Sequence, residues 1–117
     1  MKEGREYIDY LRDILDAAEK AERFIEGMDF DTFSSDDKTV FAVVRALEIV
    51  GEATKKIPDS LKESYKGLPW REMAGLRDKL IHDYISVNLE VVWKTVKNDL
   101  PTLRDKVSSL LATESGD

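Results

Sequence analysis

Apolar residues recur at intervals of three and four almost throughout the 117-residue chain, and stretches that alternate apolar and polar residues are hard to find. This spacing matches the 3.6 residues of a helical turn, so the sequence predicts an all-α protein. The length allows one domain, which we expect over residues 1–111 as an antiparallel bundle of four to five helices. Residues 112–117 are expected to form a frayed tail.

Caps and helix breakers divide the chain into helical segments. The first is predicted over residues 2–27, ending at Gly27. Pro101 lacks a backbone donor and should kink or split the last helix near Asn98. A second helix is predicted from a capping box at Ser34 and Asp37 to Ile57, and a short helical turn follows at 58–67. The last two helices are predicted from Pro69 to Tyr84 and, after a cap at Asn88, as far as Leu110.

The predicted second helix is apolar over about two thirds of its circumference. Its narrow polar stripe includes Arg45, Glu48 and Glu52. Such a helix must be covered on most sides, either by the other helices or by a second copy of the chain, so a homodimer is a reasonable expectation. The polar stripe either lines a cleft or is the only wet edge of the helix.

Composition excludes several kinds of site. With no cysteine and one histidine, the chain can form neither a disulfide nor a thiolate or multi-histidine metal site, and we expect no metal and no cofactor. A formal charge of -6 argues against a general polyanion-binding surface. No apolar run approaches a membrane span and no signal peptide is visible, so we expect a cytoplasmic protein without membrane contact.

The segment GLRDKLIHDY, residues 75–84, contains the only histidine, with Arg77 five residues before it and Tyr84 two after it. On an ideal helix, Arg77 and His82 are rotated by ~140° and displaced by ~7.5 Å, so a straight helix would not bring them together. Two arrangements would bring them together. Either the helix loosens near His82, or a two-fold axis brings His82 of one chain toward Arg77 of the other.

These residue types suit phosphodiester cleavage. A neutral imidazole can take the proton of a ribose 2′-hydroxyl, and an imidazolium can give one to the leaving oxygen. A guanidinium can hold two phosphate oxygens and stabilise the charge on pentacovalent phosphorus without a metal. Asp78, one helical turn before His82, could orient the ring. The plainer interpretation is a surface or capping histidine, a solvated Arg77, and a Tyr84 packed in the core.

The same segment, with PW at 69–70, LEIVGEA at 47–53, YIDYLRDIL at 7–15 and VWKTVKNDLP at 92–101, resembles the HepT-like ribonuclease toxins of the HEPN superfamily. The most specific element is an arginine, then a histidine after four intervening residues, then a tyrosine after one more intervening residue. Arg77, His82 and Tyr84 match this spacing. Many members have Asn where this chain has Asp78.

This resemblance implies a HEPN-like homodimer whose interface cleft holds the motif. It further implies a metal-independent endoribonuclease toxin of a type VII-like toxin-antitoxin pair, acting on RNA. Its partner would be an MntA-like minimal nucleotidyltransferase antitoxin, which transfers AMP to Tyr84. We therefore expect Arg77 and His82 to be catalytic, Tyr84 to be modified, and Asp78, Glu48 and Glu52 to support the site. The alternative is a catalytically silent helical dimer that binds a nucleotidyltransferase or a nucleotide.

Overall fold

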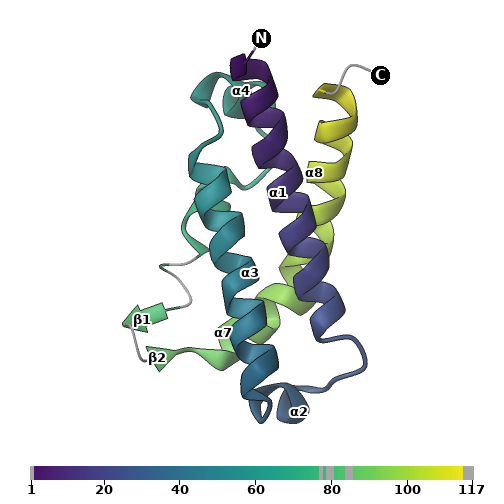
Figure 1. The fold of residues 1–117 in the computed structure, drawn as a ribbon, viewed down its shortest axis with the longest axis vertical. Coiled ribbons are helices and arrows are strands. Elements are labelled where there is room, and N and C mark those ends of the chain that lie inside the picture. The colour runs from purple at the N-terminus through teal and green to yellow at the C-terminus, as the bar shows by residue number, and fades with distance from the viewer. Residues whose placement is uncertain (1, 77, 79–80, 84–85, 115–117) are drawn as a thin grey trace.

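Three long helices run along the length of the molecule (Figure 1): α1 (Lys2–Phe24), α3 (Asp37–Lys55) and α8 (Leu100–Glu114). The computed structural model describes the backbone of residues 2–76, 78, 81–83 and 86–114, and the side chains of residues 7–76, 78 and 88–114. The all-α prediction is confirmed. In the described part of the chain, no helix is both long and apolar enough to cross a membrane.

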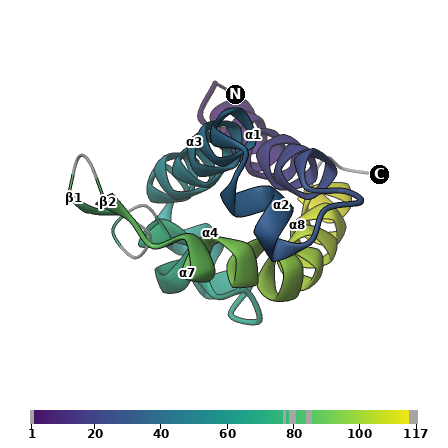
Figure 2. The same cartoon turned by 90° about the horizontal axis from the view of Figure 1, so that it is seen from below.

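The core forms where α1 packs against both α3 and α8. Figure 2 shows these helices around a common interior. Burying each Leu or Val side chain contributes about 1.5–3 kcal/mol relative to leaving it exposed, so this cluster supplies most of the driving force for folding. Among its fully buried members are Leu11, Ile14 and Ala18 from α1, Val43, Leu47 and Val50 from α3, and Leu100 and Val107 from α8.

The chain between α1 and α3 differs from the prediction. α1 ends at Phe24, three residues early, and Gly27 adopts a positive φ of 80° in the turn. A short helix α2 (Phe30–Ser34), capped by Asp29, was not expected. The predicted capping box at Ser34 is wrong: the Asp36 carboxylate accepts from the backbone N–H of Thr39 and caps α3 directly. Aspartate immediately before a helix is a strong cap, which explains the choice.

The last helical region is split as Pro101 predicts. Asn88 caps α7 (Leu89–Lys94) by accepting from the Val91 N–H, which confirms the expected cap. A π-helical turn, η1 (Thr95–Asp99), then separates α7 from α8. Pro101 has no N–H to donate to the carbonyl one turn earlier, so the regular α-helical ladder is interrupted there.

The region before α7 contains the largest departure from the prediction. α4 (Asp59–Ser64) is followed by α5 (Trp70–Ala74), which has Gly75 as its C-cap and does not continue to residue 84. Leu76 and Asp78 are helical, but Ile81–Asp83 forms strand β1, which pairs antiparallel with β2 (Ser86–Val87). The continuous helix predicted from Pro69 to Tyr84 is therefore wrong.

The end of α8 is anchored to two other elements. The helix includes residues 112–114, where the sequence predicts a frayed tail, so that prediction is wrong for these three residues. The Glu114 carboxylate accepts hydrogen bonds of 2.6 Å from the Tyr7 hydroxyl at one oxygen and from the Tyr65 hydroxyl at the other. One carboxylate thus ties α1, the segment after α4, and α8 together.

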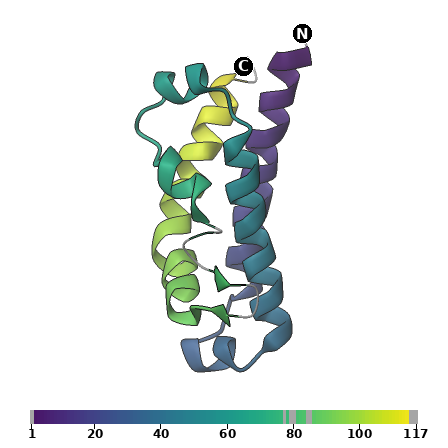
Figure 3. The same ribbon diagram turned by 90° about the vertical axis from the view of Figure 1, so that its left-hand side faces the viewer.

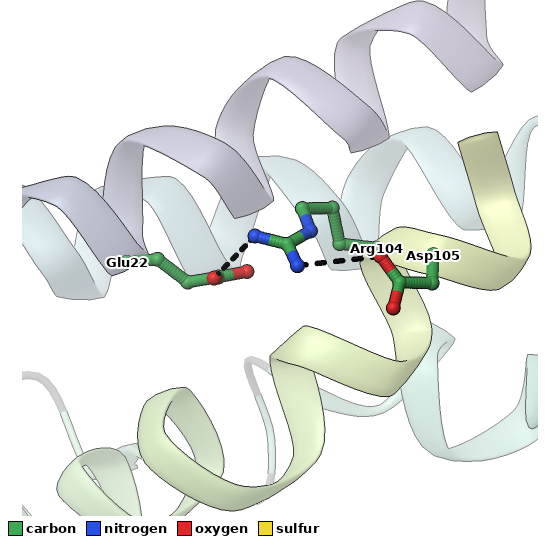
Figure 4. A network of polar contacts seen from close by, with 3 residues as sticks. All are labelled: Glu22, Arg104 and Asp105. Carbon is green, nitrogen blue, oxygen red and sulfur yellow. Dashed lines mark hydrogen bonds and ion pairs between the residues drawn. The ribbon is translucent and has the colours of Figure 1, made fainter.

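A second polar contact joins the C-terminal end of α1 to the first turns of α8 (Figure 4). Arg104 donates to Glu22 at 2.7 Å and to Asp105 at 3.2 Å. Burial raises the pKa of the Glu22 carboxyl, and the nearby Arg104 guanidinium only partly opposes this effect. Glu22 Oε2 is buried and accepts no hydrogen bond from the described residues. The guanidinium is therefore the main compensation for a costly carboxylate.

The Glu114 contacts predict a pH-dependent contribution to stability. The hydroxyls of Tyr65 and Tyr7 lower the pKa of Glu114 below its ordinary 4.5. The ionised carboxylate therefore stabilises the folded protein above pH 4.5, and this stabilisation is lost as the pH falls through the lowered pKa of the folded state. The pKa of both tyrosines is raised above 10.0, chiefly by the hydrogen bond to Glu114, so their contribution is present below pH 10 and is lost at higher pH.

We expect the double variant Tyr7→Phe and Tyr65→Phe to melt at a lower temperature than the parent at pH 7, and the gap to shrink as the pH drops below 4.5. Thermal melts followed by circular dichroism measure this. Tyr10→Phe, on the same helix as Tyr7, is the matched control. A gap that stays constant down to pH 3 would show that the carboxylate is not the partner that matters.

The Glu22 contact predicts that Arg104→Gln destabilises the protein by about 1 kcal/mol, or roughly 4 °C in Tm for a chain of this size. The reason is that the substitution leaves a partly buried carboxylate without its cation. Adding Glu22→Gln should recover part of the loss. If the double variant is less stable than the single one, the ion pair is not the cause.

Candidate functional site

The candidate segment begins beside α3. α5 packs against α3, and the buried side chains of Met73 and Leu76 anchor the chain on either side of Gly75. The indole N–H of Trp70 donates to the Tyr65 carbonyl at 2.9 Å and fixes the start of α5. The chain therefore enters the motif from a well-anchored helical turn next to the helix that carries Glu48 and Glu52.

The backbone of His82 is extended, not helical. β1 pairs with β2 through Ile81 opposite Val87 and Asp83 opposite Ser86, with an irregularity between the two pairs. Figures 1 and 3 place this hairpin on the side of the bundle formed by α3 and α7. Because the helix does not continue to residue 82, the helical spacing that would separate His82 from Arg77 no longer applies.

The structure describes only some of the remaining motif residues. Arg77 and Tyr84 lie outside the described residues, as does the side chain of His82. Asp78 is described: it is exposed and helical. The expected one-turn relation between Asp78 and His82 is wrong, because one residue is in a helical conformation and the other in a strand.

The two supporting carboxylates lie together on α3 with a shared cation. Arg45 Nη1 is 3.3 Å from Glu48 Oε1 and 4.0 Å from Glu52 Oε2. The Glu48 side chain is 21% exposed, whereas those of Glu52 and Arg45 are 56% and 61% exposed. The polar stripe predicted from the sequence is therefore a connected cluster at the surface of α3.

The charge balance of this cluster limits what it can bind. Two carboxylates and one guanidinium leave a net charge of -1, which repels a phosphate and attracts a cation. Glu48 and Glu52 are therefore suited to hold a basic side chain in position and unsuited to contact a phosphate directly. Among the described residues, no group of three or more His, Asp or Glu side chains is placed to hold a metal ion.

Sequence reasoning missed the hairpin, although a signal for it was present. Ile81, Ile85 and Val87 are β-branched residues within seven positions, which favours extended backbone. The helical spacing of Met73, Leu76, Leu80 and Tyr84 outweighed that signal. Helical periodicity carried across Gly75 therefore gave the wrong conformation at His82.

Comparison with known proteins places the chain in a family. The model of the family described as "Ribonuclease HepT-like" matches residues 14–110. A Thermococcus cleftensis protein named "Probable ribonuclease HepT" is 52% identical over 106 residues, which cover 91% of this chain and 96% of the relative. A relative from Caldanaerobacter subterraneus subsp. tengcongensis, named provisionally as an RNase, is 40% identical over 90% of this chain and 94% of its own length.

A third relative, from Methanocaldococcus jannaschii and also named provisionally as an RNase, is 37% identical over 92% of this chain and 88% of its own length. No solved structure gives a significant match. The family model spans most of the helical core and the whole candidate segment. The chain belongs to the HepT-like ribonuclease family.

Proposed function

We propose that this protein is a metal-independent endoribonuclease toxin of a type VII-like toxin-antitoxin pair. Membership in a family described as ribonucleases supports cleavage of RNA. The observation that carries the site assignment is the extended backbone of Ile81–Asp83. This conformation frees His82 from the helical spacing that would hold it away from Arg77, which was the main geometric objection to a shared site.

In the proposed reaction, the His82 imidazole accepts the proton of a ribose 2′-hydroxyl, and the 2′-oxygen attacks the adjacent phosphorus. The bond from phosphorus to the 5′-oxygen breaks, and an imidazolium returns a proton to that oxygen. Arg77 binds the non-bridging phosphate oxygens and stabilises the negative charge that develops on them. The products are a 2′,3′-cyclic phosphate and a 5′-hydroxyl, and no redox or metal step is required.

The supporting residues act through charge. Glu48 and Glu52 repel phosphate, so we assign them to positioning the basic side chains of the site and not to contacting the RNA. Asp78 is assigned a polar role at the edge of the site, which its exposure allows. The active unit is a homodimer, in which a two-fold axis places residues of both copies in one cleft.

Regulation is assigned to Tyr84. An MntA-like nucleotidyltransferase partner transfers AMP from ATP to the Tyr84 hydroxyl and releases pyrophosphate. The added phosphate brings negative charge next to Arg77 and His82 and occupies the place of the substrate phosphate. The modification would therefore block the site without unfolding the protein.

Cleavage of a mixed RNA pool in excess chelator tests the reaction. We expect the parent to cut the RNA, and His82→Ala and Arg77→Ala to cut it at least ~100-fold more slowly, because each loses a group that acts in the transition state. Arg71→Ala, which removes an exposed arginine on nearby α5, is the matched control and should cut at the parent rate.

Two further observations sharpen this test. RNA with 2′-deoxy substitutions should resist cleavage, and the products should carry cyclic phosphates. Equal cleavage by all variants would refute the assignment of Arg77 and His82. Intact RNA in every reaction, the parent included, would favour the silent dimer, which the net charge of -6 also suits.

Intact-mass analysis tests the switch. After incubation with ATP and the partner nucleotidyltransferase, the parent should gain one or more AMP units, and Tyr84→Phe should gain none. Tyr10→Phe should be modified like the parent, because Tyr10 lies on α1 outside the motif. AMP mapped to any tyrosine other than Tyr84 would contradict the assigned role.

A further inference from the structure

Residues 65–69 connect α4 to α5, and the chain then continues into the candidate segment. We call residues 65–69 the strap. α4 and the C-terminal end of α8 lie at the same end of the molecule (Figures 1 and 3), so the strap leaves α4 within reach of α8. The contacts that hold the strap determine where α5 begins.

Two polar contacts fasten the strap to α8. The Tyr65 hydroxyl donates to Glu114 Oε2 at 2.6 Å. The Lys106 ammonium donates to the Gly67 carbonyl at 2.9 Å. The two α8 residues are separated by about 12 Å along the helix axis, so the strap is held at two distinct places. Leu68, directly after Gly67, is buried and adds an apolar anchor.

The Tyr65 carbonyl links the strap to α5. It accepts a hydrogen bond of 2.9 Å from the Trp70 indole N–H and one of 3.3 Å from the Leu68 backbone N–H. Tyr65 therefore takes part at both ends of a short relay. Its hydroxyl is held by α8, and its carbonyl holds the first residue of α5.

α5 depends on tertiary contacts for its exact position. A helix of five residues is too short to be stable by itself, and Pro69 at its N-cap makes no side-chain hydrogen bond. Met73 is buried and α5 packs on α3, but apolar packing has no directional preference. A hydrogen bond is directional, so the strap restricts how α5 can rotate and shift on α3.

We propose that Tyr65 and Trp70 are positioning residues for the candidate site. Tyr65, held by Glu114, fixes Trp70, and Trp70 fixes α5, whose last residue lies three positions before Arg77. A group that must meet a phosphate in the transition state loses much of its effect when it is displaced by about 1 Å. The inference rests on the proposed function and adds the residues that keep Arg77 in place.

Amide hydrogen exchange and cleavage kinetics of single variants test this assignment. Trp70→Phe and Tyr65→Phe each remove one hydrogen bond and keep an aromatic ring. Each should speed exchange in residues 71–78 at least ~3-fold. Each should also lower kcat for RNA about tenfold and change KM by less than about twofold, because displacing a group that acts in the transition state affects kcat.

Tyr7→Phe is the matched control. It removes the other 2.6 Å hydrogen bond to Glu114, on the α1 side, and lowers stability without removing a contact of the strap. It should leave exchange in residues 71–78 and kcat at the parent values. The NMR resonances of the His82 ring, the only histidine in the chain, should shift in Trp70→Phe and stay unchanged in Tyr7→Phe.

Each outcome decides the assignment. Unchanged exchange in residues 71–78 would overturn the positioning role, and so would equal effects of Tyr65→Phe and Tyr7→Phe, since these indicate a general loss of stability. Faster exchange with the parent kcat would overturn it as well. If Trp70→Phe does not fold by circular dichroism, Tyr65→Phe decides. A parent that cuts no RNA would overturn the proposed function, and exchange with the His82 resonances would then decide whether the strap positions the segment.

Discussion

Burial of the apolar side of α1 between α3 and α8 is the constraint on which the rest of the structure depends. Leu11, Ile14 and Ala18 are fully buried there. Because these contacts fix α3 in the bundle, they also fix α5, which packs on α3. The start of the candidate segment is therefore positioned by packing that involves the N-terminal helix.

Two sets of polar contacts add to this packing. Glu114 ties the ends of α1 and α8 to the segment after α4 through two tyrosine hydroxyls. Arg104 offsets the partly buried charge of Glu22 between the same two helices. Both contacts lie away from the candidate segment, so their role is to hold the bundle that positions the segment. The proposed chemistry is assigned to the segment that contains β1, beside the bundle.

The sequence predicted the long helices because their apolar spacing is regular, and it predicted the break before α8 because Pro101 cannot donate a hydrogen bond. It did not predict the strand at Ile81–Asp83. The pairing of Ile81 with Val87 is a contact that helical periodicity does not encode. The polar stripe of Arg45, Glu48 and Glu52 was visible as spacing on one helix, but the ion pairs within it were not predicted. The choice of Asp36 over Ser34 as the cap depends on where α3 begins.

The two strongest features of the candidate site complement each other. The hairpin removes the helical restriction on His82, and the α3 cluster provides carboxylates that attract basic side chains. A site of this kind needs its guanidinium and imidazole to reach the same phosphate group. Family membership agrees with such chemistry.

The most direct test uses the fact that His82 is the only histidine in the chain. Its ring gives a single set of NMR resonances, which can be followed while a 2′-deoxy oligonucleotide that resists cleavage is added. The account predicts that these resonances shift on addition in the parent, and that the shift is abolished in Arg77→Ala. A ring that shows the same spectrum with and without the oligonucleotide, at concentrations where binding is saturated, would contradict a shared site for Arg77 and His82.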